Sequence, residues 1–353
     1  MFLPTFVNKT YLAFLLLLPL YFIGMDLLLY FRVQNYDIRP RANNTQALPY
    51  RSPILCDLNP ICTVTVKAMM LDHPNHYILS PLASLVDYLL GISRSWTWLT
   101  PNAISVSHVI IAMIGARCIA RNSLFSRQVG VVLFQVRAWM DDLDGHVART
   151  RLNIKGEKSD VGSIGFFVDG ICDALGCIAL IVALFVFLRR NANDCTNYER
   201  PVRAPLLPSL PHSAVSSNSY RKSPLYNMLI VSLHFSLISI AWNRYISLYQ
   251  DLLEIDNKNS PPIDREDFYD RQTVVFRSSA FWVITLVWKM FNFHAMMDYM
   301  LLAIFLPGNL RCRIQEYVRL TWWQIPAILS VLTFISELHY INAYAYVKIL
   351  TMN

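Results

Sequence analysis

The segment Asp141-Asp142-Leu143-Asp144-Gly145-His146-Val147-Ala148-Arg149 decides how this chain is interpreted. On an α-helix, positions three, four and seven residues apart share one side, so residues 141, 144, 145 and 148 lie on the same face. That face carries the carboxylates of Asp141 and Asp144 beside the small residues Gly145 and Ala148. The segment therefore predicts a helix with an acidic, sterically open face.

A second set of small and acidic residues follows on the next apolar segment. Gly165, Asp169 and Asp173 recur every four residues and so share one face of another helix. If the two helices face each other, four aspartates point toward a common gap.

These aspartates occur in a chain with the composition of a membrane protein. Of its 353 residues, 54% are hydrophobic and 16% are charged, with a mean hydropathy of +0.35, whereas about a quarter of the residues in soluble domains are charged. Apolar runs of roughly 20 residues, enough to cross ~30 Å of hydrocarbon, begin near Tyr11, Ala103, Gln128, Val161, Tyr226, Val274 and Trp322. We expect an all-α, polytopic integral membrane protein with about seven transmembrane helices.

The spans divide the chain into three expected regions. Residues 1–35 form an uncleaved signal-anchor helix, residues 36–96 a lumenal segment, and residues 97–350 a membrane core of six spans. Residues 189–225 of that core are rich in Pro, Ser and Arg and cannot bury a hydrophobic core, so they predict a disordered cytosolic loop. The sixth span, residues 274–306, exceeds a single crossing and must tilt, kink or project from the membrane.

Loop charges predict the orientation of these spans. By the positive-inside rule, a cytosolic amino terminus places the basic loops 121–127, 189–225 and 307–321 in the cytosol. The lumenal segment then holds a glycosylation sequon at Asn43 and two neighbouring cysteines, Cys56 and Cys62, and use of the sequon and pairing of the cysteines are left open. The predicted outside loop 147–160 is also basic, and we interpret its basic residues as substrate ligands: Arg149, Arg151, Lys155 and Lys158.

Aspartates at membrane depth require a cation. A charged side chain within a membrane helix costs at least ~2.5–3.5 kcal/mol, and clustered carboxylates also repel one another. Carboxylate oxygens suit hard divalent ions such as Mg²⁺ or Mn²⁺, and a set of this size can hold two ions ~3.5–4 Å apart for phosphoryl transfer. The formal charge of +7 is not accompanied by any nucleic-acid-binding motif, so no nucleic-acid partner is expected.

The full pattern resembles the signature of the CDP-alcohol phosphotransferase family. All eight signature residues occur in order: Asp141, Asp144, Gly145, Ala148, Arg149, Gly165, Asp169 and Asp173. The Pro101-Asn102 pair is similar to the start of that family's first core span, and the resemblance covers about residues 97 to 350. One departure is the spacer of 15 residues between Arg149 and Gly165, which is longer than the family's.

The resemblance implies a role for each matching residue. Asp141, Asp144 and Asp169 would be metal ligands, and Asp173 would be a fourth ligand or the catalytic general base. The nucleotide and its phosphates would be bound by Asn102, Gly145, Ala148, Arg149 and Gly165. Asp142 is rotated about 100° from Asp141 on the helix, so we give it no ligand role.

Within that family, the added amino-terminal span is most similar to members that transfer phosphoethanolamine from CDP-ethanolamine to the primary hydroxyl of ceramide and release CMP. That resemblance implies Mn²⁺ (or Mg²⁺), membrane lipids as partners, and a Golgi location with the active site facing the lumen. Other alcohols (choline or inositol), diacylglycerol as the acceptor, and homodimer formation stay open. From a different class, an ion transporter could also hold acids at membrane depth.

Other polar residues in the spans have simpler interpretations. Asp26 and Asp298 are expected to be solvated or paired, and Lys289 to snorkel toward the interface or meet a substrate phosphate. The small residues Gly145, Gly165 and Gly170 could instead serve close packing between helices.

Overall fold

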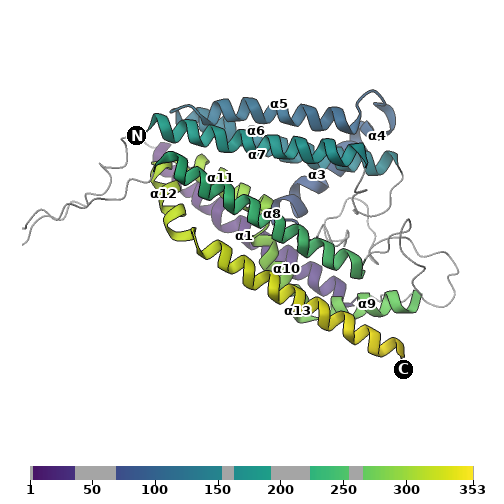
Figure 1. Ribbon diagram of the computed structural model, residues 1–353. Coiled ribbons are helices and arrows are strands. Elements are labelled where there is room, and N and C mark those ends of the chain that lie inside the picture. Colours follow the sequence, from purple (N-terminus) through teal and green to yellow (C-terminus); the bar gives the residue numbers. More distant parts are fainter. Residues whose placement is uncertain (1–2, 36–68, 153–162, 192–222, 254–264, 353) are drawn as a thin grey trace, which may run out of the picture.

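The computed structural model describes residues 3–35, 69–152, 163–191, 223–253 and 265–352, and their secondary structure is entirely helical (Figure 1). In chain order the elements are α1 (Leu3–Asn35), the short π-helix η1 (Asn75–Leu79), α3 (Ser80–Leu90), α4 (Ile92–Ser95), α5 (Pro101–Ile119), α6 (Leu124–Arg151), α7 (Ile164–Arg190), α8 (Pro224–Leu253), α9 (Arg265–Arg277), α10 (Ser279–Met290), α11 (Phe293–Phe305), α12 (Leu310–Thr321) and α13 (Gln324–Met352). The predictions for Asn43, Cys56 and Cys62, and most of the predicted loop 189–225, lie outside the described residues.

Five of these helices are long and apolar enough to cross a membrane, which confirms an all-α, polytopic membrane protein. Their spanning segments are Leu16–Gln34, Pro101–Ile119, Ile164–Arg190, Pro224–Gln250 and Gln324–Tyr346. Two other predicted spans differ from these in composition or continuity. Helix α6 has the length of a span but carries the acidic motif and several arginines, and the apolar helices α10 and α11 are each short.

The sixth predicted span, residues 274–306, begins within α9 and is broken at Ser278 and again at Phe291-Asn292, so of the expected alternatives it is kinked. Helix α10 ends before Phe291, and α11 begins after Asn292, whose side-chain oxygen accepts a hydrogen bond from the Ala295 N–H at 2.7 Å. The side-chain nitrogen of Asn292 donates to the Met70 carbonyl at 3.1 Å. Because this asparagine caps a new helix and ties it to another segment, the chain changes direction there rather than continuing as one long helix.

The helices that position the acidic motif form one group in the fold. Helix α5 packs closely against both α6 and α7 (Figure 1). The approach of α5 and α6 depends on Gly115 and Gly130, since a Cβ atom added to Gly130 would lie 2.7 Å from Ile119 Cγ1 and 2.8 Å from the Gly115 carbonyl oxygen. Helices α8, α10, α11 and α13 form a second group, which meets the first through contacts of α8 with α7 and of α11 with α6.

Residues 80–99 cover the carboxyl end of α6. The guanidinium of Arg151 donates hydrogen bonds to four backbone carbonyls in this stretch, those of Ile92, Ser93, Trp96 and Leu99, at 2.9–3.1 Å. This contradicts the interpretation of Arg151 as a substrate ligand, because its donors already hold the chain that precedes α5. The side chain of His146 on α6 also contacts this stretch, because its Nε2 atom lies 3.1 Å from Asp87 Oδ2.

A buried ion pair connects the amino-terminal helix to the rest of the protein. The Lys289 Nζ atom on α10 lies 2.5 Å from Asp26 Oδ1 on α1, and Lys289 is only 3% exposed. His73 also contacts the Asp26 carboxylate, at 2.7 Å, and Tyr77 donates its hydroxyl to it. Lys289 therefore does not snorkel, and Asp26 is paired, as expected.

Candidate active site

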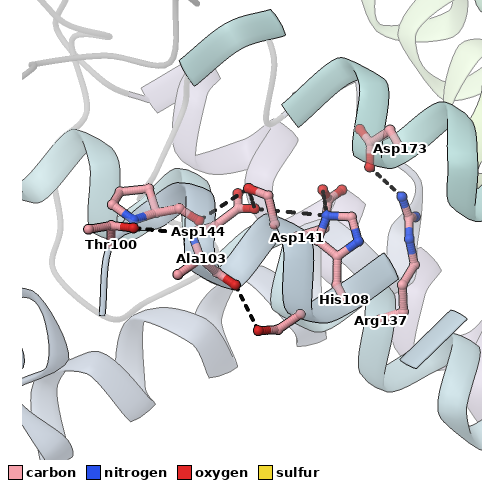
Figure 2. A network of polar contacts seen from close by, with 10 residues as sticks. Thr100, Ala103, His108, Arg137, Asp141, Asp144 and Asp173 are labelled. Carbon is pink, nitrogen blue, oxygen red and sulfur yellow. Dashed lines mark hydrogen bonds and ion pairs between the residues drawn. The ribbon is translucent and has the colours of Figure 1, made fainter. Parts of the chain in front are cut away.

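Four side chains from three helices form a group that could hold a metal ion. His108 on α5, Asp141 on α6, and Asp169 and Asp173 on α7 each offer a ligand atom, and these atoms all lie within 4.8 Å of one another. The group exists because α5 packs against both of the other helices and brings their acidic faces together (Figure 2). A histidine and three of the four predicted aspartates thus share one small volume.

His108 is the member of this group that sequence reasoning missed. Its ring is completely buried, and neither ring nitrogen has a hydrogen-bond partner. The Nε2 atom lies 3.7 Å from Asp141 Oδ1 and 4.0 Å from Asp144 Oδ2. Asn102, Ser105 and His108 follow one another at intervals of three on an apolar helix, and this polar face was the signal that could have identified it.

Asp144 lies at the edge of the group rather than within it. Its Oδ2 atom accepts a hydrogen bond from the Ser105 hydroxyl at 2.5 Å, and the residue is 4% exposed. Ser105 therefore fixes the orientation of this carboxylate from the neighbouring helix. Its predicted role as a metal ligand is not tested by this arrangement.

Arg137 is a second functional candidate that sequence reasoning did not identify. It lies one turn before Asp141 on α6, is 1% exposed, and forms an ion pair with Asp173 on α7. The guanidinium passes over Gly176, where an added Cβ would lie 2.9 Å from Arg137 Nε. A methyl group at position 176 would therefore displace the guanidinium from its contact with Asp173. Figure 2 shows this contact between Arg137 and Asp173.

The acidic group opens into a cavity of about 1270 Å³. All four predicted aspartates line it. Asp142 lines it too, although helical periodicity had predicted that this residue lies off the acidic face. The five residues predicted to bind the nucleotide line it too: Asn102, Gly145, Ala148, Arg149 and Gly165. The cavity therefore joins the acidic group to every residue of the predicted nucleotide site.

The glycines of this site leave space for different neighbours. A Cβ added to Gly145 would lie 3.0 Å from Arg149 Nη1, so the guanidinium rests over this glycine. At Gly165 the nearest atom would be Asn102 Oδ1 at 3.8 Å, and at Gly170 nothing lies within 4 Å. Close helix packing therefore does not explain Gly165 or Gly170, and Gly165 leaves room for a ligand beside Asn102.

The residues present fit a divalent cation. Three carboxylates and an imidazole offer oxygen and nitrogen ligands within one coordination volume, a set compatible with Mn²⁺ or Mg²⁺. Both ring nitrogens of buried His108 lack hydrogen-bond partners, and since buried polar atoms otherwise form hydrogen bonds, this histidine suits a role as a metal ligand. The arrangement can thus hold a metal ion at residues that line a large cavity.

Comparison with known proteins shows the family to which this chain belongs. A family model described as ceramide phosphoethanolamine synthase matches residues 3–349. A Drosophila melanogaster protein named ceramide phosphoethanolamine synthase is 33% identical to this chain. The alignment is 386 positions long, gaps included, and covers 97% of this chain and 95% of that protein. Both matches include the amino-terminal helix as well as the helices that carry the acidic group.

Proposed function

We propose, because the chain belongs to the ceramide phosphoethanolamine synthase family, that this enzyme transfers phosphoethanolamine from CDP-ethanolamine to the primary hydroxyl of ceramide and releases CMP. The observation that carries the proposal is the metal-binding group of α5, α6 and α7 at the wall of a cavity of about 1270 Å³. In this reaction the bond between the phosphorus and the CMP oxygen breaks, and a new bond forms from that phosphorus to the ceramide oxygen.

We assign the metal site to His108, Asp141, Asp169 and Asp173, with Asp144 beside them. One or two Mn²⁺ or Mg²⁺ ions bound there would neutralise charge on the transferred phosphoryl group. Arg137 holds the Asp173 carboxylate in place from α6, and Ser105 does the same for Asp144.

The nucleotide would lie beside the acidic group on the same three helices, toward the start of α5, the end of α6 and the start of α7. Arg149 at the end of α6 supplies a guanidinium for the phosphates, and Asn102 and Gly165 border the space between α5 and α7. The proton of the acceptor hydroxyl must pass to a base, and Asp173 is the candidate for it. Asp173 would act either as this base or as a metal ligand.

We further propose that the enzyme resides in the Golgi membrane with a cytosolic amino terminus and a lumenal active site. The alternation of basic and acidic loops and the sequon at Asn43 support this orientation. The division into an anchor (1–35), a lumenal segment (36–96) and a core (97–350) accompanies it.

A substrate panel with purified protein tests the proposal. The detergent-solubilised enzyme would be given CDP-ethanolamine or CDP-choline with either ceramide or diacylglycerol, and CMP release and the lipid product would be measured. We expect the greatest turnover with CDP-ethanolamine and ceramide, its loss in EDTA, and its return with Mn²⁺. Preference for diacylglycerol, or full activity after chelation, would contradict the proposal.

A further inference from the structure

The cavity that contains the acidic group continues along a polar face of α8. Six residues of this helix line it, at intervals of four, three, four, four and three: Ser232, Ser236, Ser239, Asn243, Ser247 and Gln250. These intervals keep the side chains on one face over about 27 Å of helix. The rest of this helix is apolar enough to cross a membrane, so the polar face requires a reason.

These polar groups are not satisfied by the protein around them. Among the residues that the structure describes, the side chains of Ser236, Ser247 and Gln250 have no hydrogen-bond partner, and Asn243 reaches Ser239 only at 3.5 Å. Serines in membrane helices commonly donate to a carbonyl one turn earlier, and Ser330 of α13 does this at 2.8 Å. The serines of α8 instead keep their hydroxyls free on the cavity side.

The position of the face relative to the acidic group follows from chain direction. Helices α7 and α8 are in contact and run in opposite directions (Figure 1). The carboxyl-terminal half of α8, with Asn243 and Ser247, therefore lies at the level of Asp169 and Asp173 near the start of α7. The amino-terminal half faces the later part of α7, where the cavity wall also includes apolar side chains beside Ser232 and Ser236: Ile178, Ile181, Val182 and Phe235.

This arrangement fits a lipid whose polar groups surround its reacting hydroxyl. A ceramide carries an amide and a secondary hydroxyl within two carbons of its primary hydroxyl, whereas diacylglycerol offers only ester oxygens, which accept but do not donate. The serine hydroxyls and the asparagine amide supply both donors and acceptors. Apolar residues deeper along α7 and α8 provide a surface for hydrocarbon chains.

We propose that Ser239, Asn243 and Ser247 bind the amide and secondary hydroxyl of the acceptor, and so select an N-acylated amino-alcohol lipid over diacylglycerol. This inference rests on the proposed function. A site built to hydrogen-bond a substrate group rejects an analogue that lacks it, because the protein's own polar groups are then left unpaired. The residues that select the lipid acceptor thus lie on α8, across the cavity from the acidic group.

The test compares acceptors in the wild type and in the double variant Asn243→Ala/Ser247→Ala. Each enzyme would be assayed with a ceramide, the same ceramide without its secondary hydroxyl, and diacylglycerol. We expect the wild type to prefer the complete ceramide. The double variant should lose about 10- to 100-fold in kcat/KM for ceramide, at about tenfold per lost hydrogen bond. Its kcat/KM for the deoxy analogue should equal its kcat/KM for ceramide, and its KM for CDP-ethanolamine should be unchanged.

Ser330→Ala on α13 is the matched control and should keep the wild-type acceptor preference. A double variant that still prefers ceramide over the deoxy analogue as strongly as the wild type would overturn the inference while leaving the proposed function intact. A wild type that releases CMP only with acceptors other than ceramide would overturn the proposed function itself. Ser247→Ala alone, which removes one cavity-facing oxygen, serves the same comparison if the double variant does not fold.

Discussion

The ion pair between Asp26 and Lys289 is expected to hold the amino-terminal helix against the membrane core. Helix α1 exposes much of its apolar surface and is attached through the buried side chains of Leu29 and Val33, a hydrogen bond from Gln34 to the Phe276 carbonyl, and this buried ion pair. Asp26→Asn leaves the Lys289 ammonium buried at 3% exposure, with the Tyr77 hydroxyl at 3.2 Å and His76 Nδ1 at 3.3 Å. It removes the carboxylate in direct contact with the ammonium and leaves the more distant Asp72 as a negative neighbour. Lys289→Met is less disruptive, because His73 and Tyr77 still bond the Asp26 carboxylate.

The expected loss of stability in Asp26→Asn follows from the burial of the ion pair. Removing one partner of a buried ion pair costs about 3–5 kcal/mol, and because the Asp26 side chain is 20% exposed we use the lower end, ~3 kcal/mol. At roughly 2 °C per kcal/mol for a chain of this size, Asp26→Asn should lower the melting temperature by about 6 °C. The double variant Asp26→Asn/Lys289→Met should be more stable than Asp26→Asn, because neither charge is then left unpaired.

Tryptophan fluorescence during heating of the purified protein in detergent measures these shifts. An exposed ion pair, Arg244 with Glu337 at 3.1 Å, provides the control, because both side chains are more than 40% exposed and such pairs contribute ~0–1 kcal/mol. Arg244→Met should therefore move the midpoint by less than about 2 °C. Below their melting temperatures all these variants should release CMP at nearly wild-type rates, since neither pair lines the cavity. If the double variant loses as much stability as the two single variants together, the pairing argument is wrong.

Three further predictions concern the site itself. Asp141→Asn and Asp169→Asn should abolish both CMP release and Mn²⁺-dependent CDP-ethanolamine binding, whereas Asp142→Asn, outside the four-ligand group, should stay within about tenfold of wild-type activity; an active Asp169→Asn would refute the assignment. His108→Ala should raise the Mn²⁺ concentration needed for half-maximal activity by at least about 10–100-fold, measured by titration after EDTA treatment, and an unchanged requirement would remove this histidine from the metal site. Gly176→Ala should displace the Arg137 guanidinium and cost about 1–3 kcal/mol of stability with reduced turnover; unchanged melting and turnover would show that the arginine accommodates a methyl group without consequence.

The sequence by itself determined the features that depend on local spacing and composition. Hydropathy predicted a polytopic all-α membrane protein, because each crossing requires its own apolar run whatever its neighbours are. Helical periodicity placed Asp141 with Asp144 and Asp169 with Asp173, because a period of 3.6 residues fixes which side chains share a face. The length of residues 274–306 likewise required a tilt, a kink or a projection from the membrane, and the structure has breaks at Ser278 and at Phe291-Asn292.

Only the tertiary structure decided which of these faces meet. His108 joins the acidic group because α5 packs between α6 and α7, and Arg137 reaches Asp173 because Gly176 leaves space on the facing helix. Lys289 contacts Asp26 across 263 positions of sequence, whereas its hydropathic context alone left snorkelling and contact with a substrate phosphate as alternatives. The periodicity of a helix fixes its own faces but carries no information about the identity of the helix opposite. Ion pairs, ligand groups and cavities arise between helices, and so they follow from packing.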